Sequence, residues 1–237
     1  MAVLFPLSRL PQSLLPFLLF IIAIVAATAQ FPIQYCPDSV ANYTANTTFQ
    51  SNLGRLLPVL AANGSANGFL NATAGDLPDR VYGLVLCRGD VAPGTCGSCL
   101  ATATEGVVQA CPYKKSAVIW YDLCMLRYSN LPFFSVADSN VRVRLASTEN
   151  LTETARFNQQ VGAMMSGLVR YAAYNASARM FATGAAGYVD PAAPTIYGMV
   201  QCTRDLSADD CAGCLRGITD EIPERYSGNR GARTLTS

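Results

Sequence analysis

The chain has 237 residues, of which 51% are hydrophobic and 14% charged, with nine cysteines and no histidine. This apolar content is sufficient for folded domains with buried cores and excludes a disordered chain. The absence of histidine excludes Ser-His-Asp and Cys-His catalytic sites and every zinc site that uses histidine. The formal net charge is +1 and Lys114 and Lys115 are the only lysines. Since such a chain has no strong positive field, we expect no nucleic-acid partner.

Residues 1–29 have the pattern of a secretory signal peptide. Arg9 precedes an apolar run over residues 14–27, and the small residues at 27–29 supply a cleavage site before Gln30. The run is short for a membrane-spanning helix, and no later stretch approaches about 18 consecutive apolar residues. We therefore expect a secreted mature chain without a transmembrane segment.

Six Asn-x-Ser/Thr sequons follow the signal peptide. They begin at Asn42, Asn46, Asn63, Asn71, Asn150 and Asn175. Sequons at this density fit passage through the endoplasmic reticulum and predict N-glycosylation. The same oxidising route favours disulfide bonds between the cysteines.

The first element expected in the mature chain is an amphipathic helix. Its apolar stripe consists of Phe49, Leu53, Leu56, Leu57 and Leu60, which repeat at helical spacing. Asn46 or Thr47 is available to cap its start. Pro58 is expected to bend or shorten it.

Short runs rich in Val, Ile and aromatic residues predict strands further along the chain. These runs are Tyr82 to Cys87, Ala117 to Tyr121 and Cys124 to Tyr128. Between the first two runs, the spacing of Cys99, Ala103 and Val107 predicts a second helix after the Cys-x2-Cys motif, with the Cys99 side chain facing the core. Helices and antiparallel strands together predict an α+β fold.

The chain contains an internal duplication. At an offset of 115 residues, 82–87 align with 197–202, and Cys96 and Cys99 align with Cys211 and Cys214. Both copies therefore contain Cys-x8-Cys-x2-Cys-Leu after a strand-like run, which is a specific signal. At an offset of 108 residues, the apolar stripe of the first helix aligns with a second stripe. That stripe consists of Phe157, Val161, Met164, Met165 and Leu168. We expect two helices packed on an antiparallel sheet in each copy.

These residues resemble the plant cysteine-rich secretory repeat, the ginkbilobin-like salt-stress/antifungal domain. The resemblance rests on the Cys-x8-Cys-x2-Cys motif and on the strings at 120–130 and 197–206. It implies tandem repeats, as in secretory proteins and in the ectodomains of cysteine-rich receptor-like kinases, each with a five-stranded antiparallel sheet. We expect the first repeat over residues 30–143 and the second over residues 144–237.

The resemblance implies a disulfide pattern where the spacing alone leaves many pairings open. The implied bonds in the first repeat are Cys36–Cys111, Cys87–Cys96 and Cys99–Cys124. They would act as structural staples. A redox Cys-x-x-Cys site needs an exposed thiolate, and a zinc site needs two such motifs much closer together, so we favour neither.

The second repeat departs from this pattern. Cys202 can pair with Cys211, but Tyr226 stands in the register of Cys111. The partner of Cys214 would fall two residues beyond Ser237. We therefore expect the second repeat to lack its last strand, with an unpaired Cys214 thiol and an exposed sheet edge. Either the chain is a truncated product, which we favour, or Cys214 pairs with another molecule, for example in a dimer.

Candidate ligand-binding residues are few. Relatives that resemble ginkbilobin bind mannose through an Asn, an Arg and a Glu. The corresponding residues of the first repeat are Pro37, Val118 and Ser129. In the second repeat only Arg233 stands in register, so it is the single, weak candidate for sugar binding. The pair Phe133 and Phe134 is expected to pack between the two repeats.

No residue pattern points to catalysis. The available carboxylates are Glu105, Asp122, Asp209, Asp210 and Glu221. None has a spacing that dictates acid-base chemistry, and the pair at 209–210 fits the start of a helix, where negative charge is favourable. We expect no enzyme activity, no cofactor and no metal site.

The function expected from the sequence is non-enzymatic recognition in plant stress or defence signalling, in the apoplast. The ligand would be a protein or a glycan of the cell wall. Three alternatives remain: a carbohydrate-binding antifungal lectin, an ectodomain fragment of a cysteine-rich receptor-like kinase, and a reactive-thiol sensor that uses Cys214.

Overall fold

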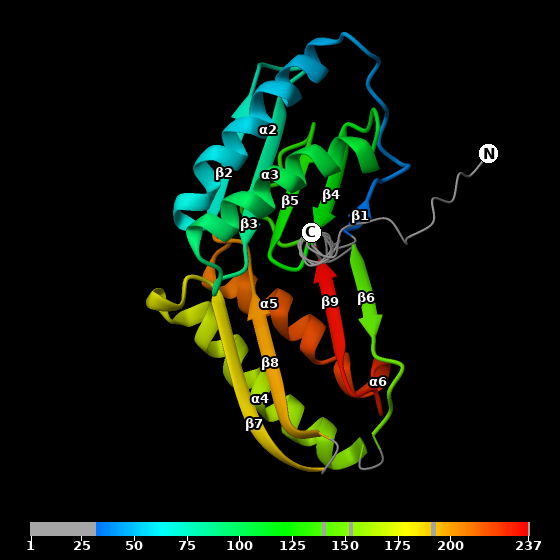
Figure 1. Ribbon diagram of the computed structural model, residues 1–237, viewed down its shortest axis with the longest axis vertical. Helices are drawn as coiled ribbons and strands as arrows, with labels where there is room; N and C mark the ends of the chain where they lie inside the picture. The colour runs from blue at the N-terminus through cyan, green and yellow to red at the C-terminus, as the bar shows by residue number, and fades with distance from the viewer. Residues whose placement is uncertain (1–31, 139–140, 152–153, 191–192, 237) are drawn as a thin grey trace, which may run out of the picture. The chain divides into compact units, whose positions relative to one another are not determined.

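The computed structural model describes residues 32–138, 141–151, 154–190 and 193–236 (Figure 1). The predicted signal peptide lies outside the described residues. The elements of the first repeat are β1 (Ile33–Tyr35), α2 (Thr48–Asn67), β2 (Phe69–Ala74), β3 (Val81–Cys87), α3 (Pro93–Ala110), β4 (Ser116–Trp120) and β5 (Cys124–Ser129). They are followed by β6 (Arg142–Ala146), α4 (Thr154–Tyr174), the 3-10 turn η2 (Ala176–Ala178), β7 (Phe181–Asp190), β8 (Ala193–Gln201), α5 (Ala208–Thr219), α6 (Ile222–Arg225) and β9 (Ala232–Thr236).

The first repeat contains one five-stranded antiparallel sheet, in the order β1-β4-β5-β3-β2. The last strand in the sequence, β5, therefore lies at the centre of the sheet, between β3 and β4. Its register pairs Cys124 with Cys87 on one side and Met125 with Trp120 on the other. The α+β fold with a five-stranded sheet is confirmed for this repeat.

Helices α2 and α3 cover one face of this sheet (Figure 1). The five apolar residues of the α2 stripe are all buried, as their spacing predicts. The backbone N–H of Gln50 donates to the Thr47 hydroxyl, and the Gln50 side chain accepts from the N–H of Asn46. This reciprocal arrangement caps the helix start. Pro58 lies inside the helix and does not end it.

Helix α3 begins earlier than the sequence pattern predicts. It starts at Pro93, so the Cys-x2-Cys motif lies within its first two turns instead of before them. Proline suits the first helical position because its missing N–H would have no helical partner there. The buried face carries Cys96, Leu100, Ala103 and Val107, whereas Cys99 is half-buried.

The opposite face of the first sheet is covered by Phe133 and Phe134. Phe133 is buried against Leu84 and Leu86, and Phe134 packs on the edge of the Tyr82 ring. The Arg127 guanidinium lies 4.2 Å from the centroid of the Phe133 ring, within the range of a cation–π contact. The two rings thus pack on the sheet of their own repeat, and Phe133 also lines a cavity together with residues of the second repeat.

The second repeat has counterparts of both helices, with η2 and α6 in addition, but its sheet is divided. Strand β7 pairs with β8, strand β6 pairs with β9, and the two pairs belong to separate sheets. Helix α4 packs on β7 and β8, and α5 packs on α4 (Figure 1). Strand β6 crosses the expected boundary at residues 143 and 144, so we propose that the boundary lies before Arg142.

A glycine at the same place in both repeats lets the first helix of each approach its strand. A Cβ atom added to Gly83 would lie 2.6 Å from a Leu60 methyl carbon, and one added to Gly198 would lie 2.7 Å from the Met164 methyl carbon. Both distances are too short for ordinary contact. The Tyr-Gly dipeptide seen in both copies of the sequence therefore marks close helix–strand packing.

Candidate functional site

Disulfides join the helices of both repeats to their sheets. Cys36 is bonded to Cys111, Cys87 to Cys96, Cys99 to Cys124, and Cys202 to Cys211. The two cysteines of each Cys-x2-Cys motif are never bonded to each other. The one remaining cysteine of the described residues, Cys214, is a half-buried free thiol on α5.

Cys214 occupies the position that Cys99 has in the first repeat. There, Cys99 on α3 is bonded to Cys124, the first residue of the central strand β5. In the second repeat, the flanking strands β8 and β9 are both present. Among the described residues no strand lies between them. We call this gap the strand slot.

A cavity adjoins the strand slot. This cavity, of about 510 Å³, is lined by both facing strands, including Val200 on β8 and Thr234 on β9, and also by residues of the first repeat such as Leu84, Trp120 and Phe133. Cys214 also lines it. The sequence predicted an exposed sheet edge, and the structure instead has two edges that face each other across this cavity. A missing central strand leaves two open edges, whereas a missing outer strand leaves one.

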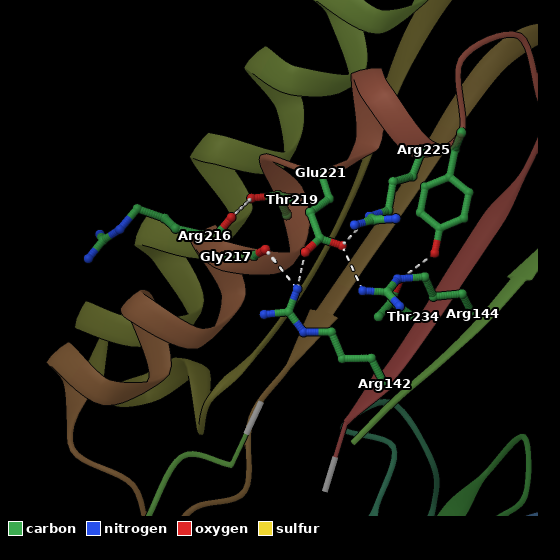
Figure 2. Close-up of polar contacts among 9 residues, drawn as sticks. Arg142, Arg144, Arg216, Gly217, Thr219, Glu221, Arg225 and Thr234 are labelled. Carbon is green, nitrogen blue, oxygen red and sulfur yellow. Dashed lines mark hydrogen bonds and ion pairs between the residues drawn. The ribbon is translucent and has the colours of Figure 1, made fainter. Parts of the chain in front are cut away.

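Glu221 holds β6 in place from the end of α5 (Figure 2). Its carboxylate bonds to Arg142, accepts from Nη2 of Arg144 at 3.0 Å, and lies 3.2 Å from Nε of Arg225. Arg142 also donates to the carbonyl oxygen of Gly217 on α5. The pair β6–β9 is therefore tied to the helical layer by charges that need no central strand.

The same contacts set the acidity of Glu221. The hydrogen bond from Arg144 lowers the pKa of the Glu221 carboxyl, and the charges of Arg142 and Arg225 lower it further. The carboxylate therefore loses its charge at a lower pH than an ordinary glutamate does. Glu221 is thus a structural anchor with three guanidinium partners, and it is not poised to transfer a proton near neutral pH.

Two contacts fix β9 itself. The hydroxyl groups of Tyr226 and Thr234 are hydrogen-bonded at 2.8 Å. Arg233 donates to the Asp122 carboxylate of the first repeat at 2.7 Å, with both groups partly exposed. Arg233 thus lies on the wall of the strand slot, and its guanidinium is engaged by a carboxylate of this chain.

The positions that would hold a sugar in relatives like ginkbilobin are closed in the first repeat. Pro37 is buried, Val118 is 3% exposed and Ser129 is 7% exposed. The Ser129 hydroxyl also accepts from the backbone N–H of Leu131. These side chains therefore present no polar group to a sugar in solution.

The other carboxylates considered for catalysis are dispersed. Glu105 is exposed on α3, Asp209 accepts from the Tyr174 hydroxyl, and Asp210 interacts with Ser207 at the start of α5. The Ser207 hydroxyl caps this helix by accepting from the N–H of Asp210. Within the described ranges, no group of three or more Cys, Asp or Glu side chains is arranged to hold a metal ion.

The six sequons lie on both repeats. Four of the asparagines are exposed, namely Asn42, Asn46, Asn63 and Asn150. Asn71 on β2 and Asn175 are half-buried, and the Asn175 side chain caps η2 by accepting from the N–H of Ser177. Glycosylation at these positions remains a prediction.

The model of the salt stress response/antifungal family matches residues 35–131 and again 145–237. The chain belongs to this family. It is 35% identical to Cysteine-rich repeat secretory protein 38 of Arabidopsis thaliana, over 86% of this chain and 80% of that protein. It is also 35% identical to the Antimicrobial ginkbilobin-2-like protein of Castanea crenata, over 92% of this chain and 89% of that protein.

Members of the salt stress response/antifungal family also occur as parts of receptors. The chain is 37% identical to Cysteine-rich receptor-like protein kinase 25 of Arabidopsis thaliana, over 92% of this chain but only 33% of that protein. The tandem DUF26 ectodomain of the Arabidopsis thaliana receptor-like protein PDLP8 has the same fold, with a TM-score of 0.75 at 24% identity and coverage of 86% of this chain and 92% of that one. In the part of the chain that the structure describes, no helix is long and apolar enough to cross a membrane.

Proposed function

We propose that this protein is secreted to the plant apoplast and acts there as a non-enzymatic recognition protein in stress or defence signalling. Its ligand would be a protein or a component of the cell wall. The observation that supports this most strongly is the use of the same pair of domains in two settings, in secretory proteins and as one third of a receptor-like kinase. A module shared by both contributes recognition, since the kinase already supplies the chemistry.

Secretion is tested with the chain expressed in leaves under its own first 29 residues. We expect the protein in apoplastic wash fluid, with N-glycans that an endoglycosidase removes. The matched control lacks residues 2–29 and should stay inside the cell without glycans. Retention of the full chain inside the cell would contradict the proposal.

Recognition is tested with the purified glycosylated protein on immobilised apoplastic proteins and cell-wall polysaccharides. We expect saturable binding to at least one purified component, and loss of binding when the disulfides are reduced and alkylated. Absence of saturable binding to every component of both sets would contradict a recognition function.

An antifungal lectin is the second candidate, because the family carries the word antifungal and one relative is named antimicrobial. The burial of Val118 and Ser129 argues against mannose binding through the first repeat. A glycan array separates the two candidates. We expect no mannose binding, and mannose binding that Arg233→Ala abolishes would favour the lectin.

A further inference from the structure

We propose that an open groove on helix α4 holds the first sugars of an N-linked glycan attached to Asn175. The groove has a volume of about 520 Å³, and its lining residues are Gly167, Arg170, Tyr171, Tyr174, Asn175 and Ala176. We call it the α4 groove. The inference deepens the proposed function and rests on it, because a glycan at Asn175 requires passage of the chain through the endoplasmic reticulum.

The α4 groove follows one face of the end of α4. Gly167, Tyr171 and Tyr174 are spaced by four and by three residues, so they are neighbours on this face. A Cβ atom added to Gly167 would meet no other atom within 4 Å, so the floor of the groove is open at this position. The volume of the groove lies in the range of small-ligand sites, about 300–1,000 Å³. The groove is therefore large enough for sugar rings.

Two exposed tyrosine rings give the α4 groove its chemistry. Tyr171 and Tyr174 are each 52% exposed. The Tyr174 hydroxyl donates to Oδ1 of Asp209 at 2.9 Å, which holds this ring against the start of α5. A pyranose carries C–H groups on its faces and hydroxyl groups at its edge, so it packs on an aromatic face and keeps its hydroxyls free for hydrogen bonds. Arg170 supplies guanidinium N–H donors for such oxygens.

Asn175 presents its amide at one end of the α4 groove. Its Oδ1 atom accepts from the backbone N–H of Ser177 at 3.0 Å and from the Ser177 hydroxyl at 2.6 Å. Within the described part of the chain no hydrogen bond engages Nδ2, the atom that carries an N-linked glycan. The backbone N–H of Asn175 donates to the carbonyl oxygen of Tyr171 at 3.1 Å. Asn175 is thus tied to the helix that forms the groove, and a glycan on Nδ2 starts beside the two tyrosines.

The first repeat supplies a contrast on its own helix α2. At the 108-residue offset, Asn63 takes the place of Tyr171, and Ala66 takes the place of Tyr174. Asn63 also begins a sequon and is exposed, with Nδ2 donating to the carbonyl oxygen of Val59 at 3.2 Å. Residues 59–67 include no aromatic side chain. A glycan at Asn63 therefore has no aromatic surface on its own helix, which makes this sequon the matched control.

The glycan comes from a lipid-linked oligosaccharide diphosphate, the donor in the endoplasmic reticulum. Nδ2 of Asn175 loses one proton and bonds to C1 of the first sugar, as the C1–O bond to the diphosphate breaks. The chain is unfolded at this stage, so the half-buried position of Asn175 in the folded protein does not prevent transfer. After folding, the glycan covers this face of α4 and removes it from the surfaces on which a recognition partner can bind.

Tyrosine nitration tests the proposal on the secreted protein. The wild type and the Asn175→Gln variant are purified from apoplastic fluid and treated with tetranitromethane. Mass spectrometry measures glycan occupancy at Asn175 and the nitration rates of Tyr171 and Tyr113. Tyr113 lies in the first repeat and is 50% exposed, so it is the internal control. The matched glycan control is Asn63→Gln. The wild-type chain made in a bacterial periplasm is a second form without glycans, and its α4 sequence is unchanged.

We expect Tyr171 to be nitrated at least about threefold more slowly in the secreted wild type than in Asn175→Gln or the bacterial protein, because sugar rings cover its exposed face. Tyr113 should react equally in the wild type and in Asn175→Gln, and Tyr171 should stay protected in Asn63→Gln. A glycan at Asn175 with equal Tyr171 rates in all forms would overturn the groove assignment and leave secretion intact. Secreted protein with a bare Asn175 would overturn it too, whereas absence of all glycans would contradict secretion as well.

Discussion

The two repeats share two long helices and the order of the strands around them, yet only the first has a continuous sheet. In the first repeat, β5 lies between β3 and β4 and its Cys124 is bonded to Cys99. In the second, β8 and β9 are held separately, β8 by α4 and β9 by β6 and the Glu221 contacts. The comparison shows that a sheet is continuous only when its central strand is present. This holds even though that strand comes last in the sequence of the repeat.

The largest difference is expected from one leucine that both repeats share. Leu100 is 0% exposed in the first core, whereas Leu215 is 7% exposed and lines the cavity. Leu100→Ala should lower the free energy of unfolding by about 2–5 kcal/mol, because it leaves a cavity in a closed core. Leu215→Ala should cost clearly less, since part of its surroundings is already open.

Denaturant unfolding measures this pair. Trp120, the only tryptophan, is buried in β4 and reports the first repeat by its fluorescence. Circular dichroism of the helices reports both repeats. Equal losses in the free energy of unfolding for the two variants would mean that the second core is packed as closely as the first.

The next difference concerns the equivalent cysteines. Removing the Cys99–Cys124 bond with the double change Cys99→Ser and Cys124→Ser should cost roughly 2–4 kcal/mol, because the bond restricts the unfolded chain. Cys214→Ser should change stability by less than about 0.5 kcal/mol, since the free thiol forms no bond. The midpoint of Trp120 fluorescence in guanidinium measures the first change, and helix circular dichroism measures the second. A large loss of stability in the Cys214→Ser variant would contradict the claim that Cys214 forms no bond across the strand slot.

A smaller difference in stability is expected at the helix starts, and here the second repeat has the more favourable residue. Helix α5 is capped by Ser207, whereas α3 follows Ala92, which makes no side-chain cap. Ser207→Ala should cost about 1 kcal/mol, and Ala92→Ser should stabilise the first repeat by a similar amount. Thermal unfolding followed by circular dichroism measures both, and a neutral Ser207→Ala would show that the cap contributes nothing.

The smallest effect is expected from acid at Glu221, because solvent reaches its carboxylate. The folded state lowers its pKa from 4.5, so its contribution to stability is present above pH 4.5 and is lost as the pH falls through the lower folded value. Acid should therefore loosen β6 and β9 before the first sheet. The Glu221→Gln variant should already be loosened at pH 6 and show no further local change with acid. Nuclear magnetic resonance of the amides of β6 and β9 tests this, and identical acid responses of the two proteins would exclude the role of Glu221.

The sequence was a good guide to what local patterns encode. The apolar stripe of α2, the Thr47 cap, the strand from Tyr82 to Cys87 and the acidic start of α5 all follow from spacing or from residue type. It was a poorer guide to α3, where Pro93 starts the helix before the motif. The sequence did not indicate that Phe133 packs on the sheet of its own repeat, because an aromatic side chain can pack on any apolar surface within reach.

The strand slot and the Glu221 contacts were missed because both depend on long-range order. The sequence indicated that Cys214 lacks a partner, but the central place of the strand follows only from the order β1-β4-β5-β3-β2. Arg142 and Arg144 are nearly 80 residues from Glu221. Their alternation in an Arg-Val-Arg strand places both on one face, and this is the local signal from which a shared acidic partner could have been predicted.

Hydrogen exchange of the unmodified protein tests the central claim most directly. The amides of β8 and β9 that face the strand slot are compared with the equivalent amides of β3 and β4. We expect the slot-facing amides to exchange at least about 100-fold faster, because no ladder protects them, while the amides bonded across β7–β8 and β6–β9 stay protected. Equal protection on both sides of β8 and β9 would show that the second sheet is continuous in solution and would contradict the account.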